Sequence, residues 1–393
     1  MRTFLLAAGF VLLFVSEILR VYLIMPFPGS QQANTIDLAY WLANNIWWLR
    51  LIALVLIAYP ALHLFKQSGK QWKKIALVIL LLVYAAVFYM IHYQLEADVM
   101  FYQPGNKKFA QGKANTVAPD KLVLGIVING EAKAYPIQYI GYHHQVRDTV
   151  GGLPVMVTYC TVCRTGRVFS PLVHGKPEQF RLVGMDHFNA MFEDATTKSW
   201  WRQVSGEAIT GPLKGTSLEE LPSEQMILSA WQRKHPTTWV MQPDTGFTEA
   251  YAKMVNYEKG KSKGNLTRRD SLSWKDKSWV LGIVHAHTAK AYDWNELVKQ
   301  QLIQDSLPGL PLVIVLEKDS ASFHAWSRVV DGKHLDFMKL SGMDQLTDKQ
   351  TGSVWNMDGT CVSGVLAGKQ LSSVRAYQEY WHSWRSFQVG TLR

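Results

Sequence analysis

Residues 122–137 read LVLGIVINGEAKAYPI, and this stretch determines how the rest of the chain is interpreted. Two apolar runs flank Asn129-Gly130, and Asn-Gly between such runs is the strongest short signal for a β-hairpin. The sequence therefore predicts a hairpin here, followed by a short helix over Ile137–His143. Two more short helices are expected over Leu228–Lys234 and Ala376–Phe387.

The same pattern returns further along the chain. The segments VLGIV at 123–127 and AKAY at 132–135 recur at 280–284 and 289–292. Self-similarity at a constant offset indicates an internal duplication. We predict two mainly-β lobes, lobe one at 121–245 and lobe two at 279–393, joined by a basic linker at 246–278.

The first part of the chain has a different composition from the rest. Of 393 residues, 48% are hydrophobic and only 18% are charged. Three apolar runs, Phe4–Met25, Trp47–Phe65 and Ile75–Ile91, each approach the ~20 residues that cross a bilayer as a helix. We predict a three-helix transmembrane anchor at 1–97, a linker at 98–120, and a membrane-anchored α+β fold for the whole chain.

The loop charges predict the orientation of this anchor. The loop at 66–74 contains Lys66, Lys70, Lys73 and Lys74, whereas the loop between the first two runs has neither Lys nor Arg. Positive loops stay in the cytoplasm. We therefore expect an inner-membrane protein with its N-terminus inside and its soluble part on the periplasmic side. The expected partners are the lipid bilayer and a periplasmic protein.

Two further charge patterns matter. The net charge of +10 comes partly from the segment at 259–277, which lacks a nucleic-acid motif, so nucleic acid is not an expected partner. Within the apolar runs, Glu17, Arg20 and Arg50 are costly unless they are paired. We expect Glu17 to pair with Arg50 or with Arg20 towards the outer ends of the helices.

The two predicted lobes differ at positions that can carry chemistry. Lobe one has His143, His144, Cys160, Cys163 and His187, where lobe two has Gln300, Gln301, Glu317, Ser320 and Gln345. The joint absence of these side chains from one copy is what a single site abandoned in that copy would produce. The candidate site residues are therefore Cys160, Cys163, His143 and His187, with His144 expected to be only a neighbour of His143.

The two cysteines lie in the stretch VTYCTVC at 157–163. A strand precedes them and a β-like segment follows, so the sequence predicts a strand-to-strand turn rather than the helix start of a thioredoxin-like dithiol. Two thiolates with one or two imidazoles would complete a metal site for zinc or copper. A redox dithiol of Cys160 and Cys163, a structural disulfide, and a Cys160 nucleophile with a histidine base remain as alternatives.

Two long motifs carry a resemblance to a known family. HHQVRDTVGGLPVMVTYCTVCRTGRVF at 143–169 and TTKSWWRQVSGEAITGPLKG at 196–215 resemble the bacterial domain-of-unknown-function family 3179. On this resemblance, His143 takes the family's histidine position, and Cys160 and Cys163 take its dithiol positions. The family brings no established reaction.

These observations lead to one expected function and two alternatives. The first is a membrane-anchored protein with a CxxC/His metal centre of copper or zinc, for metal handling or electron transfer. The second is a thiol–disulfide oxidoreductase that uses Cys160 and Cys163. The third is a non-catalytic binding or assembly module with a structural disulfide.

Overall fold

The computed structural model describes residues 1–67, 69 and 71–393, so Lys70 of the basic loop lies outside the described residues. The chain forms two compact units. Unit 1 comprises Met1–Tyr102 and Glu178–Ser217, and unit 2 comprises Gln103–Pro177 and Leu218–Arg393.

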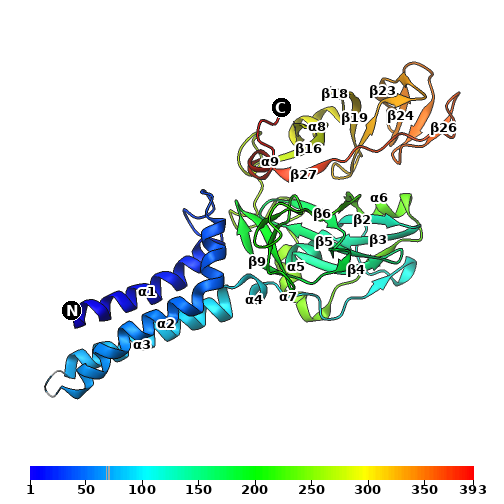
Figure 1. The fold of residues 1–393 in the computed structure, drawn as a ribbon. Coiled ribbons are helices and arrows are strands. Elements are labelled where there is room, and N and C mark those ends of the chain that lie inside the picture. Colours follow the sequence, from blue (N-terminus) through cyan, green and yellow to red (C-terminus); the bar gives the residue numbers. More distant parts are fainter. Residues whose placement is uncertain (68, 70) are drawn as a thin grey trace. The chain divides into compact units, whose positions relative to one another are not determined.

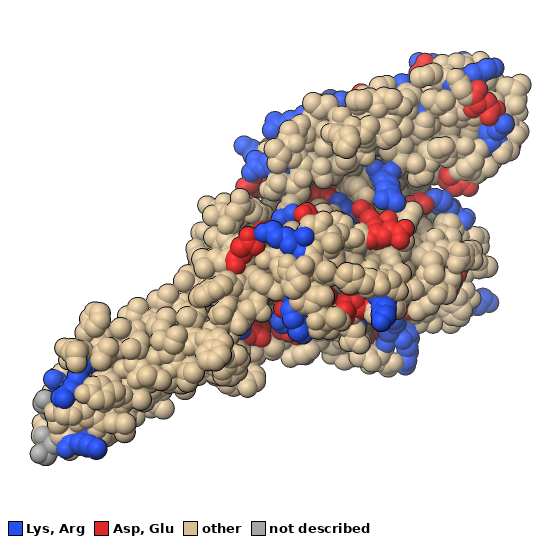
Figure 2. All heavy atoms as spheres, viewed as in Figure 1, with Lys and Arg blue, Asp and Glu red and all other residues tan. Residues whose placement is uncertain are grey.

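Unit 1 begins with three long helices, α1 (Arg2–Tyr22), α2 (Ile36–Lys66) and α3 (Gln71–Met90) (Figure 1). A π-helical turn at Ile91–Leu95 and the short α4 (Ala97–Met100) follow. All three helices are long and apolar enough to cross a membrane, which confirms the three predicted apolar helices. Figure 2 shows a long uncharged face over them, with Lys and Arg gathered at one end.

A four-stranded antiparallel sheet completes unit 1. Its order is β12 (Ala208–Thr210), β11 (Trp200–Arg202), β10 (Asn189–Asp194) and β9 (Phe180–Asp186). The sheet shares an apolar core with the helices, formed by Val183, Met191, Trp200 and Ile209 together with Ala39, Ile24 and Tyr40.

Gly184 of β9 lies directly against the chain that follows α1. The amide of Met185 donates to the carbonyl of Ile24 at 2.6 Å. A Cβ on Gly184 would lie 2.5 Å from that same carbonyl oxygen. Only glycine therefore allows this approach between the sheet and the helical part.

Unit 2 opens with the predicted hairpin. Strands β2 (Leu122–Ile128) and β3 (Glu131–Pro136) pair antiparallel around Asn129 and Gly130, which both have positive φ, as a type I′ turn requires. Helices α5 (Ile137–His143) and α6 (Leu228–Lys234) have the predicted bounds.

The strands of unit 2 form several small sheets. One sheet has the order β1 (Phe109–Ala110), β15 (Trp239–Met241), β3, β2 and β14 (Glu224–Ile227), and another has β13 (Glu220–Leu221), β6 (Thr165–Phe169), β5 (Leu153–Cys160) and β4 (Gln145–Val150). Strands β7 (Leu172–Val173) and β8 (Lys176–Pro177) form a separate pair, and α7 (Thr248–Met254) follows β15 in the chain. The chain after the basic segment forms β17 (Thr288–Asp293), β16 (Trp279–His285) and β27 (Tyr377–Tyr380) as one sheet, and β18 (Leu302–Leu307), β19 (Leu310–Leu316) and β20 (Phe323–Ser327) as another. Strands β21 (Val329–Val330) and β22 (Lys333–His334) form a pair. The last sheet has the order β23 (Phe337–Lys339), β24 (Gln345–Asp348), β25 (Val354–Asn356) and β26 (Cys361–Ser363). The helices of this part are α8 (Trp294–Gln300) and α9 (Trp381–Phe387).

The third predicted short helix is wrong in its first part. Helix α9 begins at Trp381 and not at Ala376. Residues Tyr377–Tyr380 instead pair with β16 as strand β27, and this pairing satisfies their backbone groups within the sheet.

Several contacts occur twice along the chain. A Cβ on Gly125 would collide with the Trp231 ring, and one on Gly282 would collide with the Trp384 ring. The Tyr135 hydroxyl donates to Asp148 at 2.7 Å, and the Tyr292 hydroxyl donates to Asp305 at 2.8 Å. Trp231 Nε1 donates to Thr238 and Trp384 Nε1 donates to Thr391, both at 2.8 Å. The residues that recur in the sequence therefore make matching contacts.

Candidate functional site

The CxxC segment is a turn between two antiparallel strands, as the sequence predicts. Strand β5 ends at Cys160, which pairs with Thr165 at the start of β6. Arg164 closes the turn with φ of 58°. No helix begins at this turn, so no helix dipole acts on the thiols.

Cys160 and Cys163 are buried thiols that share a hydrogen bond. Cys163 also hydrogen-bonds to the hydroxyl of Ser383 in α9. The two sulfur atoms therefore lie side by side, with a hydroxyl from the C-terminal segment next to one of them.

Distant segments hold the backbone of this turn. The amide of Tyr380 donates to the Cys163 carbonyl at 3.0 Å. Lys277 Nζ donates to the Val162 carbonyl at 2.7 Å, and the Tyr257 hydroxyl donates to the Thr161 carbonyl at 3.0 Å. Three consecutive carbonyls of the turn are thus satisfied from outside it, which keeps the dithiol under the chain that covers it.

Burial and neighbouring charges shift the pKa values at this site in opposite directions. Burial raises the pKa of the Cys163 thiol well above its ordinary value, and the Cys160 sulfur adds to this, whereas Lys277 lowers it. Burial also lowers the pKa of Lys277 to about 8, although both sulfurs act in the opposite direction. The Cys163 thiol therefore keeps its proton at neutral pH, with the ammonium group of Lys277 beside both sulfurs.

A chain of charged and polar groups leads to Cys163. Arg167 Nη2 donates to Glu379 Oε1 at 2.5 Å, and the Ser383 hydroxyl donates to Glu379 Oε2 at 3.0 Å. Burial raises the pKa of Glu379, while Arg167 and Ser383 lower it. Ser383 also hydrogen-bonds to Cys163. A change in the charge of the Cys163 thiol therefore affects the buried Arg167–Glu379 ion pair through the Ser383 hydroxyl.

Arg164 lies on the other side of the turn and is almost fully buried. Its guanidinium is 3.9 Å from the centroid of the Trp279 ring, and its Nε donates to Gln378 Oε1 at 2.9 Å. Stacking and hydrogen bonding offset part of the cost of burying this charge, while the buried Nη1 has no hydrogen-bond partner among the described residues.

The predicted ligand His143 is buried on α5. Its Nε2 lies 2.7 Å from the hydroxyl of Tyr251 in α7, and its ring is packed edge-on against Phe247. The neighbouring His144 ends α5 in a left-handed conformation, and burial lowers its pKa to about 4. Both histidines are thus part of the packing around α5.

The predicted ligand His187 belongs to unit 1. It lies in the turn between β9 and β10, and its Nδ1 is 2.7 Å from Asp186 Oδ1. Arg202 Nε donates to Asp186 Oδ2 at 2.9 Å. The hydrogen bond to Asp186 raises the pKa of His187.

The part of the chain that the structure describes contains no group of three or more His, Cys, Asp or Glu side chains placed to hold a metal ion. The structure brings Cys160 and Cys163 together, and it gives His143 and His187 the protein partners described above. The metal centre of four ligands therefore stays a prediction.

Sequence reasoning missed the side chains that surround the dithiol. In the sequence, Lys277 falls within the expected basic linker, and Glu379 and Ser383 fall within the helix expected at 376–387. No local pattern distinguishes Lys277 from the other basic residues near it, because its role depends on a contact with Val162 far away in the sequence.

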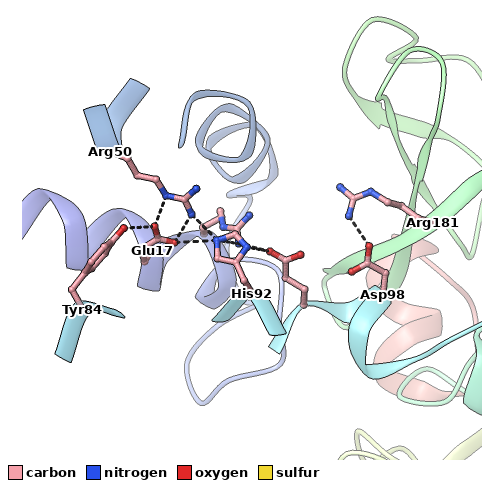
Figure 3. Close-up of polar contacts among 8 residues, drawn as sticks. Glu17, Arg50, Tyr84, His92, Asp98 and Arg181 are labelled. Carbon is pink, nitrogen blue, oxygen red and sulfur yellow. Dashed lines mark hydrogen bonds and ion pairs between the residues drawn. The ribbon is translucent and has the colours of Figure 1, made fainter. Parts of the chain in front are cut away.

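A second polar group lies within the helices of unit 1 (Figure 3). Arg50 donates to both carboxylate oxygens of Glu17, at 2.6 and 3.1 Å, which confirms one of the two expected pairs. The Tyr84 hydroxyl also donates to Glu17 at 3.1 Å. Arg20 pairs instead with Glu96, and His92 lies between the two pairs, 2.6 Å from Arg50.

These features define a chain with three membrane-length helices and a mostly-β part that carries a buried dithiol. Residues 104–391 match the family described as "Protein of unknown function (DUF3179)", and the chain belongs to that family. The match confirms the resemblance and begins after the three helices. No curated protein and no solved structure matches the chain.

Proposed function

We propose that this protein is a membrane-anchored thiol–disulfide redox protein whose active dithiol is Cys160 and Cys163. The observation that carries the proposal is the hydrogen bond between the two thiols, with Lys277 beside both. An ammonium group next to a thiol favours the thiolate, which is the nucleophile in disulfide exchange.

The reaction transfers two electrons from the dithiol to an external disulfide. The Cys160 thiolate attacks one sulfur of R–S–S–R, and R–S⁻ leaves and takes up the proton from Cys160. Cys163 then attacks the Cys160 sulfur of the mixed disulfide and releases the second R–S⁻, which takes up the Cys163 proton. The products are a Cys160–Cys163 disulfide and two R–SH molecules.

Burial of both sulfurs sets a condition on this reaction. A partner disulfide reaches Cys160 only when the covering chain, including Ser383 and Tyr380, moves away from the turn. We therefore infer that the dithiol reacts with a periplasmic protein partner that displaces this segment, and reacts slowly with small disulfides.

The test uses the full chain in mild detergent, with Cys361→Ala as the background so that only two thiols remain. Oxidised glutathione is added, and alkylation with mass spectrometry follows the loss of both thiols. Lys277→Met should slow this loss, by about threefold for each unit by which the thiol pKa rises, because lower thiolate population is partly offset by higher nucleophilicity. Lys275→Met, an exposed lysine two residues away, should not change the rate.

Because even a slow reaction reaches equilibrium with time, a Cys160/Cys163 pair that is still reduced after prolonged incubation, while the urea-unfolded chain is oxidised, would show that the dithiol is not redox-active. Equal rates for Lys277→Met and Lys275→Met would remove the assigned role of Lys277. The first outcome would leave a non-catalytic assembly module, in which the CxxC turn only joins parts of unit 2.

A second candidate uses the same two sulfurs. Adjacent buried thiols suit a soft ion such as copper(I), which needs fewer ligands than tetrahedral zinc. Elemental analysis of protein purified without chelator tests this candidate. Copper near one equivalent that is lost in Cys160→Ser supports it, and zinc near one equivalent would instead require further ligands such as His143 or His187.

We also propose the duplication and the orientation. The repeated Gly–Trp, Tyr–Asp and Trp–Thr contacts support two lobes of common origin. The lysine-rich loop after α2 supports an inner-membrane anchor with this loop in the cytoplasm and the dithiol on the periplasmic side. Labelling of single cysteines at exposed positions of this loop and of unit 2, in intact and in lysed cells, tests the orientation.

A further inference from the structure

Two adjoining cavities lie in unit 2, away from the dithiol. Their volumes are about 260 and about 500 Å³, and Lys234, His324 and Asp358 line both. We refer to them together as the α6–β20 cleft. Their size is typical of sites for small organic ligands.

His324 presents a fixed imidazole to this cleft. Its Nε2 lies 2.8 Å from Glu317 Oε1, and both side chains are more than nine-tenths buried. The ring is also stacked parallel to Trp326, with centroids 5.1 Å apart. Because Nε2 donates to the carboxylate, Nδ1 is left as a hydrogen-bond acceptor for a donor in the cleft.

Two of the three cations that line the cleft are paired with carboxylates, and the third, Arg375, donates to the Glu220 carbonyl. Arg233 pairs with Glu317 at 2.5 Å, and Lys234 pairs with Glu224 at 2.7 Å. The carboxylate of Asp358 accepts only the backbone amide of Thr360, at 2.9 Å, among the residues that the structure describes. The lining carries four carboxylates, those of Glu224, Glu317, Asp344 and Asp358, against these three cations, so a net charge of −1 faces a ligand in the cleft.

The remaining walls suit a compact ligand with hydroxyl groups. Met226 and Met357 give apolar surface, and the side chains of Gln345 and Asn356, which are hydrogen-bonded to each other at 3.0 Å, give amide groups. Such a mixture of apolar surface and a few fixed polar groups is characteristic of a small-molecule site.

We propose that the α6–β20 cleft binds a hexose-sized amine. Its ammonium group pairs with Asp358, and a hydroxyl or amine donates to Nδ1 of His324. Neither the dithiol nor a metal takes part, so the site is independent of the redox function proposed above.

The test is ligand-observed NMR with the full chain in detergent, using glucosamine as the probe. Glucose and N-acetylglucosamine are matched controls that lack the positive charge. Glucosamine should show saturable binding about tenfold tighter than either control, since a charge-assisted hydrogen bond is lost in both. Asp358→Asn should remove this preference, and Asp331→Asn, an exposed aspartate elsewhere, should keep it.

Equal binding of glucosamine and glucose, or no saturable binding of glucosamine, would overturn the proposal. Retained preference in Asp358→Asn would overturn the assignment of that carboxylate. Thermal melts of both variants are recorded alongside, and the comparison of the three sugars on the unmodified chain stands even where Asp358→Asn does not fold.

Discussion

At the scale of single residues, the carboxylate of Glu17 illustrates why buried charges have partners. It accepts two hydrogen bonds from Arg50 and one from Tyr84 within the helices. Leaving one member of such a pair without its partner is strongly unfavourable, since the remaining charge stays away from water.

Glu17→Gln should therefore lower the free energy of unfolding by about 3–5 kcal/mol, because Arg50 keeps its charge and loses its counter-ion. Thermal unfolding in detergent measures the change. Glu249→Gln, an exposed glutamate on α7, is the control and should have little effect. A Glu17→Gln protein as stable as the control would mean that the pair contributes nothing to stability.

A second prediction at this scale concerns pH and His144. Burial lowers its pKa to about 4, so the unfolded chain, with an ordinary histidine pKa near 6.5, takes up the proton first. The contribution of the neutral imidazole to stability is complete above about pH 6.5 and is lost as the pH falls towards 4. The loss amounts to about 3 kcal/mol.

His144→Gln is a matched variant, because Gln301 has the same left-handed conformation at the end of α8. The stability of this variant should fall less between pH 6.5 and 4 than that of the unmodified chain, as followed by urea unfolding. If the stability of both proteins fell by the same amount between pH 6.5 and 4, the assignment of the low pKa to His144 would be contradicted.

At the scale of elements, the sequence was most informative where local signals and packing agree. The Asn-Gly turn gave the β2–β3 hairpin, and the bounds of α5 and α6 followed from local patterns. The pattern at 376–387 was misleading, because pairing with β16 holds Tyr377–Tyr380 as a strand and tertiary pairing overrides local preference. The surroundings of Cys163 could not be predicted, since they come from Lys277 and Ser383, which are distant in sequence.

The contact between β9 and the chain after α1 gives a prediction at this scale. Gly184→Ala would place a Cβ 2.5 Å from the carbonyl oxygen of Ile24, and backbone atoms cannot move aside as a side chain can. Gly342→Ala is the matched control, because Gly342 also has positive φ but has nothing within 4 Å of the added Cβ. The Gly184 variant should be less stable by about 1–3 kcal/mol in thermal melts. Equal melting temperatures of the Gly184→Ala and Gly342→Ala proteins would show that the close contact between β9 and Ile24 does not require glycine.

At the scale of the whole molecule, the compact units do not follow the order of the sequence. Residues 178–217 form a sheet whose core includes Ile24, Ala39 and Tyr40 from the helical part. The family match begins at residue 104 and includes this sheet without the helices that complete its core. A mostly-β region defined by sequence similarity alone is therefore not a complete folding unit.

Removal of residues 1–102 should consequently expose Val183, Met191 and Trp200 to water. We expect the truncated protein to bind a hydrophobic dye, to show red-shifted tryptophan emission and to aggregate, because the lost contacts are apolar. The full chain in detergent is the comparison. A truncated protein that stays monomeric and unfolds in one cooperative transition would contradict this expectation.

The fit of Gly184 against Ile24 also bears on how the protein is made. Ribosomes deliver the helices first, so the carbonyl of Ile24 is in place long before Met185 is synthesised. The sheet at 178–217 can close only after its last strand, β12, has been synthesised, when the helical part of its core already exists. The helical segment is thus present before the strands that pack on it, and the order of synthesis matches the order in which this core can form.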